Sequence, residues 1–198
     1  MKQSKNSSTT EELDSFTIFL HFGLMMFGVL AWLTGDWAGD YKRIKHLGYT
    51  VHKMLGMGTA LFVGARLFHG FMGPEQARFA NWVPYTPERL KMVLEDMRGL
   101  FTLKLPERGP HQGLAALWES LGLAVFTWMT VTGFLMFLFL MPGQKAHGPM
   151  RLVKELHEIG EWLVPLFLAV HVFAVILHTL AGDDRWRKMF FLKKREAP

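Results

Sequence analysis

Four long stretches of the chain are almost free of charged residues, and the charges crowd into the segments between them. The apolar stretches run from about Phe16 to Leu33, Tyr49 to Phe71, Leu114 to Met141 and Ile159 to Ala181. A water-soluble core alternates polar and apolar residues at short period, whereas a helix needs roughly 20 mostly apolar residues to cross a bilayer. The pattern therefore predicts an all-α membrane protein built as a four-transmembrane-helix bundle.

The polar segments complete the predicted organisation. Residues 1–15 are expected to form a polar N-terminal tail, residues 16–181 the membrane domain and residues 182–198 a basic tail. Between the second and third spans, Thr86 followed by Pro87 is typical of a helix start, because a hydroxyl caps free N–H groups and proline suits the first turn. The apolar residues that follow share one face, which predicts a short amphipathic helix on the membrane surface: Leu90, Val93, Leu94 and Met97.

Lysine and arginine are distributed unequally among the polar segments. Six lie between the second and third spans and six in the tail after Gly182, against three in each of the other two loops. Because cytoplasmic loops carry an excess of these residues, both termini and the amphipathic helix are predicted to lie in the cytoplasm. Topology and anionic lipid explain the basic tail, so the expected partner is membrane lipid and no nucleic acid is expected.

Composition narrows the chemistry that such a membrane protein can perform. The chain has 198 residues, a formal net charge of +5, no cysteine, nine histidines and thirteen methionines. Without cysteine there are no disulfides, no thiolate-held iron–sulfur clusters and no covalent c-type haem attachment. Histidine and methionine remain as candidate ligands for a metal ion or a haem.

Histidines inside the spans are the strongest candidates, because ionisable residues are costly in a membrane and are usually functional there. His157 and His171 are fourteen residues apart, so they project from nearly one face of the fourth helix at depths about 21 Å apart. Under the predicted topology, His21 lies at the depth of His171, and His52 lies at the depth of His157. One pair near each membrane face is the arrangement of two haem sites with two axial imidazoles each.

Two alternative ligands stay open. His178 lies two turns beyond His171 on the same face and could replace it, but His171 is preferred because it is deeper in the bundle. His178 would then contact a haem propionate or the headgroup region. His46 could replace His52, although it follows a lysine in a loop and is expected to be interfacial. The remaining histidines are expected to be solvated or interfacial: His69, His111 and His147.

Two basic residues are candidate partners for the cofactor. Arg66 lies fourteen residues after His52, on the same helix face and one haem site deeper. A guanidinium inside a span needs an anionic partner, and a haem propionate would supply one. Lys53 is assigned the same role at the outer haem, with snorkelling of the side chain to the interface as the alternative for both residues.

Several segments resemble bacterial cytochrome b561-type proteins and the b-type cytochromes associated with membrane-bound hydrogenases and dihaem cytochromes c. They are Leu20-His21-Phe22, the run from His52 to Gly56 with Arg66 beyond it, the stretch from Arg66 to Phe79, and the stretch from Leu156 to Val172. The resemblance covers nearly the whole chain and implies a four-helix bundle with two haem b groups. It implies that His21 pairs with His171 on the cytoplasmic side, and His52 with His157 on the outer side.

The leading functional hypothesis is a respiratory electron carrier of the bacterial inner membrane. It would link a periplasmic partner, a cytochrome c or a dehydrogenase or hydrogenase, to the quinone pool. The alternative is a stand-alone haem oxidoreductase of the superoxide:quinone or ferric-chelate reductase type. A metal or proton transporter would require discontinuous helices and paired intramembrane carboxylates, which the sequence does not show. The electron donor and acceptor, the direction of electron flow and assembly into a homo-oligomer stay open.

Overall fold

The computed structural model describes residues 14–38, 47–102, 104–106, 108–109, 111–140, 145–183 and 185–192. Within these ranges all regular elements are helical. They are α1 (Ser15–Leu33), α2 (Gly35–Ala38), α3 (Leu47–Met72), the 3₁₀ turn η1 (Glu75–Ala77), α4 (Phe79–Trp82), α5 (Pro87–Phe101), α6 (Gly113–Phe139), α7 (Pro149–Leu180) and α8 (Trp186–Met189).

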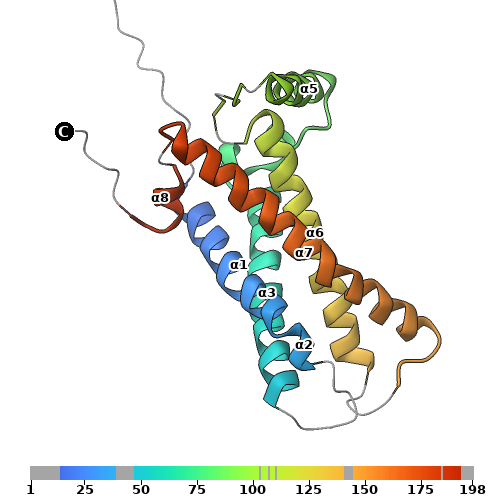
Figure 1. The fold of residues 1–198 in the computed structure, drawn as a ribbon. Coiled ribbons are helices and arrows are strands. Elements are labelled where there is room, and N and C mark those ends of the chain that lie inside the picture. The colour runs from blue at the N-terminus through green and yellow to red at the C-terminus, as the bar shows by residue number, and fades with distance from the viewer. Residues whose placement is uncertain are drawn as a thin grey trace, which may run out of the picture.

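The four long helices α1, α3, α6 and α7 form an elongated bundle in which each runs opposite to the one before it (Figure 1). Helix α2 lies at one end of the bundle, beside the start of α3, and this end is called the α2 end. Helix α5 packs on α6 at the opposite end, where α8 also lies, and this end is called the α5 end. The connections from α1 to α3 and from α6 to α7 are short, which favours antiparallel neighbours, whereas α3 and α6 are joined by a long segment that contains η1, α4 and α5.

Three of the described helices are long and apolar enough to cross a membrane: α1, α6 and α7. The second predicted span corresponds to α3, which has 26 residues but carries two histidines, a lysine and an arginine that lower its mean hydropathy. A helix of that length spans about 39 Å, which exceeds the thickness of a bilayer core. The four-span bundle is therefore shown for three helices, and the passage of α3 across the membrane stays a prediction.

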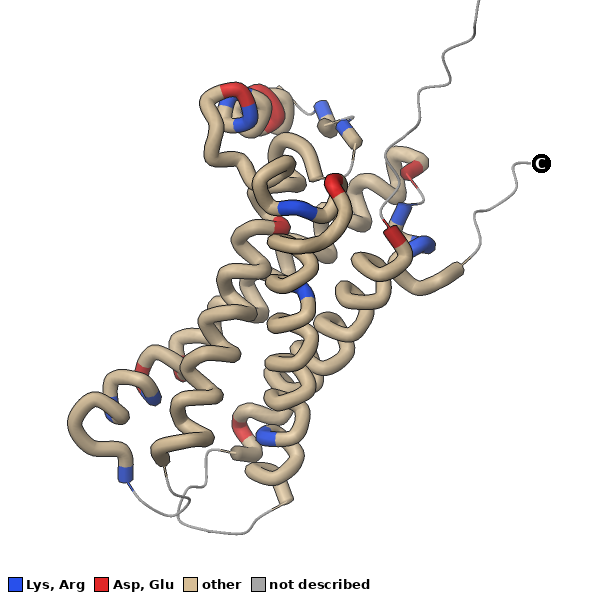
Figure 2. The backbone as a smooth tube through the Cα atoms, turned by 180° about the vertical axis from the view of Figure 1, so that it is seen from behind, with Lys and Arg blue, Asp and Glu red and all other residues tan. Residues whose placement is uncertain are grey.

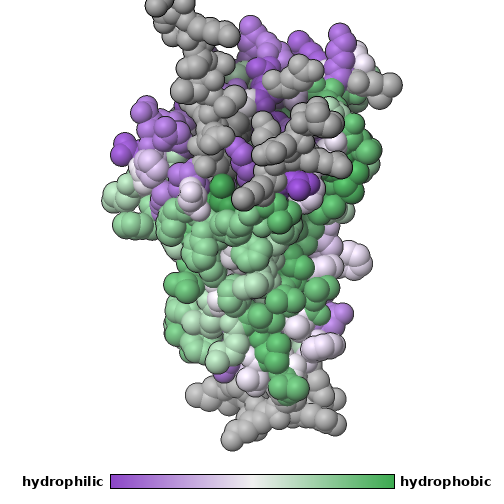
Figure 3. Space-filling model, turned by 90° about the vertical axis from the view of Figure 1, so that its left-hand side faces the viewer, coloured by the Kyte–Doolittle hydropathy of each residue, from purple (hydrophilic) through white to green (hydrophobic). Residues whose placement is uncertain are grey.

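The surface of the molecule separates into an apolar band and charged ends. Green apolar side chains cover the middle of the bundle, and purple polar side chains gather mainly at the α5 end (Figure 3). Lysine, arginine, aspartate and glutamate are likewise concentrated toward the two ends of the bundle (Figure 2). Large side chains such as Trp162 and Leu180, each 80% exposed, would be costly in water. The band is the surface expected of a protein whose solvent is lipid.

Glycines bring α1 and α3 into close contact. A Cβ at Gly23 of α1 would lie 2.0 Å from the ring of Phe62, and one at Gly58 of α3 would lie 2.3 Å from the ring of Phe27. The two contacts are reciprocal, since each helix offers a glycine to a phenylalanine of the other. Small residues let membrane helices approach closely, because van der Waals packing is their main attraction in lipid.

Helix α7 is packed differently from its neighbours. Close backbone packing joins α1 to α3, α3 to α6 and α6 to α7, but among the described helices it does not join α7 to α1 or α3. A central cluster of Val63, Phe126 and Val164 fills the space between α3, α6 and α7. The spaces between α7 and the α1–α3 pair are crossed by side chains, and these include the candidate ligands.

The fourth helix begins before the apolar stretch that was predicted as its membrane span. The apolar stretch begins at about Ile159, whereas α7 begins at Pro149. Its first turns carry two ion pairs between residues four apart, Arg151 with Glu155 and Lys154 with Glu158. Such pairs stabilise an exposed helix, so the helix extends beyond the stretch that hydropathy marks, and His157 lies within α7 rather than at its start.

The amphipathic segment forms helix α5, and Thr86 caps it by accepting a hydrogen bond from the N–H of Arg89 at 3.4 Å. The carboxylate of Asp96, which is 6% exposed, joins α5 to the start of α6. It accepts hydrogen bonds from the N–H of Leu114 at 2.9 Å and from Nε of Arg108 at 2.6 Å. This contact fixes the amphipathic helix to the α5 end of the bundle.

Replacing Asp96 by alanine is expected to release α5 from α6, because a buried N–H and a guanidinium lose their acceptor. The loss should lower the free energy of unfolding by about 1–3 kcal/mol. Amide hydrogen exchange in detergent should show the largest increase in residues of α5. Glu95→Ala is the matched control: its carboxylate also pairs with Arg108, at 2.9 Å, but it is 47% exposed. Equal protection of α5 in the Asp96 variant and the wild type would contradict this assignment.

Candidate functional site

Histidines from three helices meet in two pairs inside the bundle. The ring centres of His21 in α1 and His171 in α7 are 6.2 Å apart, near the α5 end. The ring centres of His52 in α3 and His157 in α7 are 6.3 Å apart, near the α2 end. The structure therefore brings together the histidines that the sequence placed at equal depths.

Both separations fit two imidazoles on opposite sides of one iron. An imidazole nitrogen binds a transition metal at about 2 Å, and the ring centre lies about 1 Å further away, so two coaxial rings have centres about 6 Å apart. The described residues contain no group of three or more histidine, cysteine, aspartate or glutamate side chains that could hold a bare metal ion. Two imidazoles without further protein ligands fit a haem, whose macrocycle supplies four nitrogens.

The pair at the α2 end is held by hydrogen bonds to Nδ1 of each ring. Nδ1 of His52 lies 2.8 Å from the carbonyl oxygen of Ala31 in α1. Nδ1 of His157 lies 2.9 Å from Oγ1 of Thr132 in α6. Helices α1 and α6 thus orient the two rings, which are carried by α3 and α7, and both Nε2 atoms are left for another ligand.

The pair at the α5 end is held by packing instead. Nδ1 of His21 is buried and has no hydrogen-bond partner among the described residues. The ring of His171 stacks on Phe167 at 5.7 Å, and Phe167 stacks in turn on Trp118 at 5.4 Å, with interplanar angles of 14° and 11°. The two pairs therefore have the same spacing but different surroundings.

Arg66 is 7% exposed, and its Nη1 has no hydrogen-bond partner among the described residues. The guanidinium lies 5.1 Å from the ring centre of Phe79 and 5.6 Å from that of Trp82. A buried cation with a free donor fits an anionic group of a cofactor. The ammonium of Lys53, by contrast, lies 5.7 Å and 5.9 Å from the ring centres of Tyr49 and Phe137.

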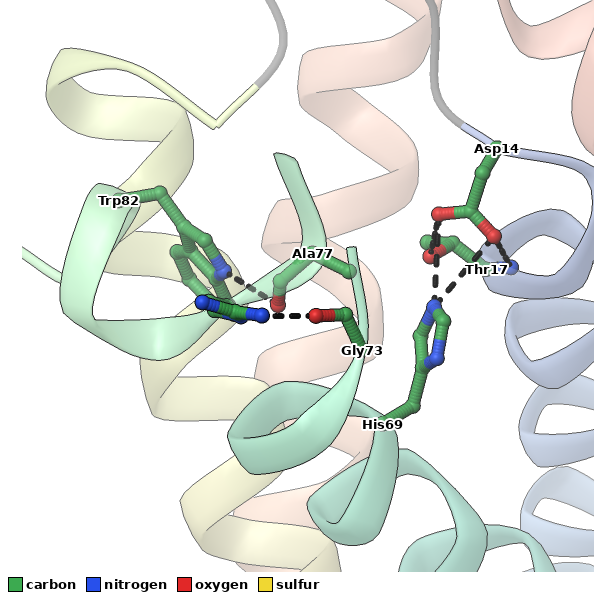
Figure 4. Close-up of polar contacts among 7 residues, drawn as sticks. Asp14, Thr17, His69, Gly73, Ala77 and Trp82 are labelled. Carbon is green, nitrogen blue, oxygen red and sulfur yellow. Dashed lines mark hydrogen bonds and ion pairs between the residues drawn. The ribbon is translucent and has the colours of Figure 1, made fainter. Parts of the chain in front are cut away.

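His69 was expected to be solvated or interfacial, but its side chain is only 10% exposed. Its Nε2 lies 3.4 Å from both carboxylate oxygens of Asp14, and it points from the end of α3 toward the start of α1 (Figure 4). Burial raises the pKa of Asp14, but hydrogen bonds from Thr17 and the contact with His69 outweigh it and hold the pKa below its ordinary value. This contact ties the two helices together at the α5 end.

His111 also lies within a cluster rather than in solvent. Its side chain is 10% exposed, forms an ion pair with Glu119 and stacks on Trp82 with ring centres 4.8 Å apart. The signal in the sequence was the carboxylate eight residues further along, but His111 has a positive φ of 57° that no periodic pattern reveals. Of the three histidines expected to be solvated or interfacial, the structure leaves His147 exposed.

The alternative ligands are placed as follows. His178 lies in the last turn of α7, where its carbonyl oxygen accepts a hydrogen bond from the N–H of Asp183 at 2.9 Å. The ring opposite His21 is that of His171. His46 lies outside the described residues.

Comparison with known proteins identifies the family of the chain. The family model described as prokaryotic cytochrome b561 matches residues 12–192, which is nearly the whole chain. Neither the curated proteins nor the solved structures that were compared with the chain gave a match.

Proposed function

Because the chain belongs to the prokaryotic cytochrome b561 family, we propose that it is a dihaem b-type cytochrome that carries electrons across a membrane. The family assignment and the apolar helices make it a membrane b-type cytochrome of electron transfer. The observation that supports two haems is the presence of two histidine pairs with ring centres 6.2 Å and 6.3 Å apart at opposite ends of the bundle. Each pair would hold one haem b.

The residues of the chain have separate tasks in this proposal. His21 and His171 would be the axial ligands of one haem, and His52 and His157 those of the other. The bound haems supply reversible one-electron chemistry at iron, and the protein sets the potential through ligation, burial and nearby charge. Arg66 would neutralise a propionate of the haem at the α5 end through its free Nη1.

Lys53 and His178, the third histidine of α7, are assigned contacts with propionates or lipid and not the ligation of iron. The ammonium of Lys53 lies over the rings of Tyr49 in α3 and Phe137 in α6. We assign it to a propionate of that haem, which its flexible stem would reach by leaving those rings. His178 would contact a propionate or lipid headgroups from the last turn of α7.

We further propose that α3 is the fourth span of the bundle. Its polar residues face protein: Arg66 is 7% exposed, and His69 is 8% exposed. Its exposed positions are apolar, since Leu61 and Phe71 are 70% and 69% exposed. A helix that hides its ionisable groups inside the bundle is compatible with lipid, although its average hydropathy is modest.

Orientation and partners follow from the charge distribution and the two-site arrangement. The excess of lysine and arginine supports the α5 end as the cytoplasmic face and the inner membrane of a bacterium as the location. A haem site near each face supports electron transfer between a periplasmic partner, a cytochrome c or a dehydrogenase or hydrogenase, and the quinone pool. The chain would then serve as the membrane arm of a respiratory pathway.

The test of this proposal is the haem content of the purified full-length chain. We expect a reduced-minus-oxidised spectrum with b-type bands and about two haems per chain. The expected reason is that each histidine pair completes the coordination of one iron. Haem extraction with pyridine counts the haem, and quantitative amino-acid analysis counts the chain. A preparation that folds but binds one haem, or none, would contradict the dihaem assignment.

A further inference from the structure

The side chain of Thr132 in α6 hydrogen-bonds to a histidine of the α2-end pair. Thr132 is 7% exposed, and its Oγ1 lies 2.9 Å from Nδ1 of His157. The same Oγ1 lies 2.8 Å from the carbonyl oxygen of Trp128 and 3.2 Å from that of Met129, one turn earlier in α6. The hydroxyl therefore bridges the backbone of α6 and an imidazole of α7.

The direction of the hydrogen bond at His157 depends on which ring nitrogen carries the proton. If Nε2 of His157 holds a haem iron, the ring proton is on Nδ1. Oγ1 of Thr132 would then accept that proton and donate its own to the carbonyl oxygen of Trp128, because a carbonyl oxygen can only accept. This arrangement would leave the lone pair of Nε2 free for iron. His52 reaches the same state, because its Nδ1 donates to the carbonyl oxygen of Ala31 at 2.8 Å.

The neighbouring glycine makes this contact sterically feasible. A Cβ at Gly133 would lie 3.0 Å from Cε1 of His157 and 3.6 Å from its Nδ1. A side chain at position 133 would press on the ring, which would have to move by a few tenths of an ångström. The ring is thus confined from one side by the helix and oriented by the hydroxyl next to it.

The pair at the α5 end has no equivalent. Nδ1 of His21 is buried without a hydrogen-bond partner among the described residues, and the ring of His171 is held by stacking on Phe167. A partner at Nδ1 raises the basicity of an imidazole ligand and fixes its orientation. The two pairs therefore differ in the hydrogen bonding at Nδ1, which is one way a protein tunes the potential of bound iron.

We propose that Thr132 is a positioning residue that orients His157 and lowers the midpoint potential of the α2-end haem by making this imidazole a stronger donor to ferric iron. The inference rests on the proposed function, since it assigns a role to Thr132 at one of the two proposed haems. The hydrogen bond acts through His157 and leaves the α5-end pair unaffected.

The test is Thr132→Val in the full-length, haem-loaded chain, which removes the hydroxyl at almost constant volume. Redox titration should show one midpoint potential moved to a more positive value and the other unchanged. A tenfold change in the ratio of ferric to ferrous haem corresponds to about 59 mV for one electron, and we expect a shift of this order. Electron paramagnetic resonance of the oxidised protein should show a change in one of the two low-spin signals.

Two further variants separate a specific hydrogen bond from a general effect on the fold. Thr132→Ser keeps the hydroxyl and should restore the wild-type potential. Thr130→Val is the matched control, because Thr130 is on the same helix and its buried Oγ1 has no hydrogen-bond partner among the described residues. It should leave both potentials unchanged. Loss of one haem in Thr132→Val together with its retention in Thr132→Ser would also support the proposal.

The results that overturn this proposal differ from those that overturn the function. If the wild type holds two haems and Thr132→Val changes neither potential, changes both equally, or shifts one to a more negative value, Thr132 does not have this role. Failure of Thr132→Ser to restore the potential would overturn it as well. A wild-type chain without two haems would instead contradict the proposed function.

Discussion

Replacing His171 by alanine should remove one haem from the chain and leave the other in place. His171 and His21 would be the protein's two ligands to one iron, and His52 and His157 would be the ligands to the other at a different depth. Loss of this imidazole would leave a cavity and remove one of the two protein ligands, which should weaken haem retention much more than loss of a residue that only contacts a ligand. The haem-to-chain ratio should therefore decrease from about two to about one, with b-type bands retained.

The reciprocal variant and a control on the same helix complete this experiment. His52→Ala should also leave about one haem, but the remaining haem should have a different midpoint potential from the one retained in His171→Ala. His178→Ala should keep both haems, because His178 lies in the last turn of α7, seven residues beyond the proposed ligand. Loss of a haem in His178→Ala together with its retention in His171→Ala would show that His178 is the ligand.

Much of the site was predictable because helix geometry is regular. Once the spans are known, the spacing between His157 and His171 fixes their common face and their separation in depth. The alternating direction of the helices then sets His21 level with His171 and His52 level with His157, and the structure has the ring centres of these pairs 6.2 Å and 6.3 Å apart. The prediction needed only the periodicity of the helix and the order of the spans.

The partners of these histidines were not predictable, because they depend on how the helices rotate against each other. Thr132 is one of several threonines in α6, and its sequence neighbours do not distinguish it from Thr130. Only the packing of α7 against α6 brings its hydroxyl to His157, at 2.9 Å. The same holds for Ala31, whose carbonyl oxygen reaches His52 from another helix.

The polar contacts at the α5 end were missed for a related reason. His69 and Asp14 are 55 residues apart in the chain, and sequence position alone put His69 at a span end and Asp14 in the polar N-terminal tail. Burial of such groups is favourable only when they find partners, and their partner is set by the tertiary fold. His111 does lie in the segment before α6, but its contact with Trp82 could not be predicted from that position.

Arg66 was assigned to a propionate from its position, and the structure adds the reason that its replacement should have a large effect. The residue is 7% exposed, and Nη1 has no hydrogen-bond partner among the described residues. The buried guanidinium can therefore bind an anionic group through this free donor. Arg66→Gln removes the charge while keeping much of the length. We expect haem to be retained about 10- to 100-fold less tightly at the α5 end, as when a residue that hydrogen-bonds to the ligands of a metal site is replaced.

The midpoint potential of the α5-end haem gives a second test of Arg66 that does not depend on how tightly the haem is bound. A nearby positive charge favours the ferrous over the ferric state, so Arg66→Gln should move the midpoint potential of the α5-end haem to a more negative value. Arg66→Lys keeps the charge but not the planar fork and should give a smaller shift. Arg89→Gln is the control, since its guanidinium donates to the carbonyl oxygens of Ala80 and Val83. Unchanged haem retention and potentials in Arg66→Gln would show that its free Nη1 faces no propionate, because removal of a buried ionic partner cannot be silent.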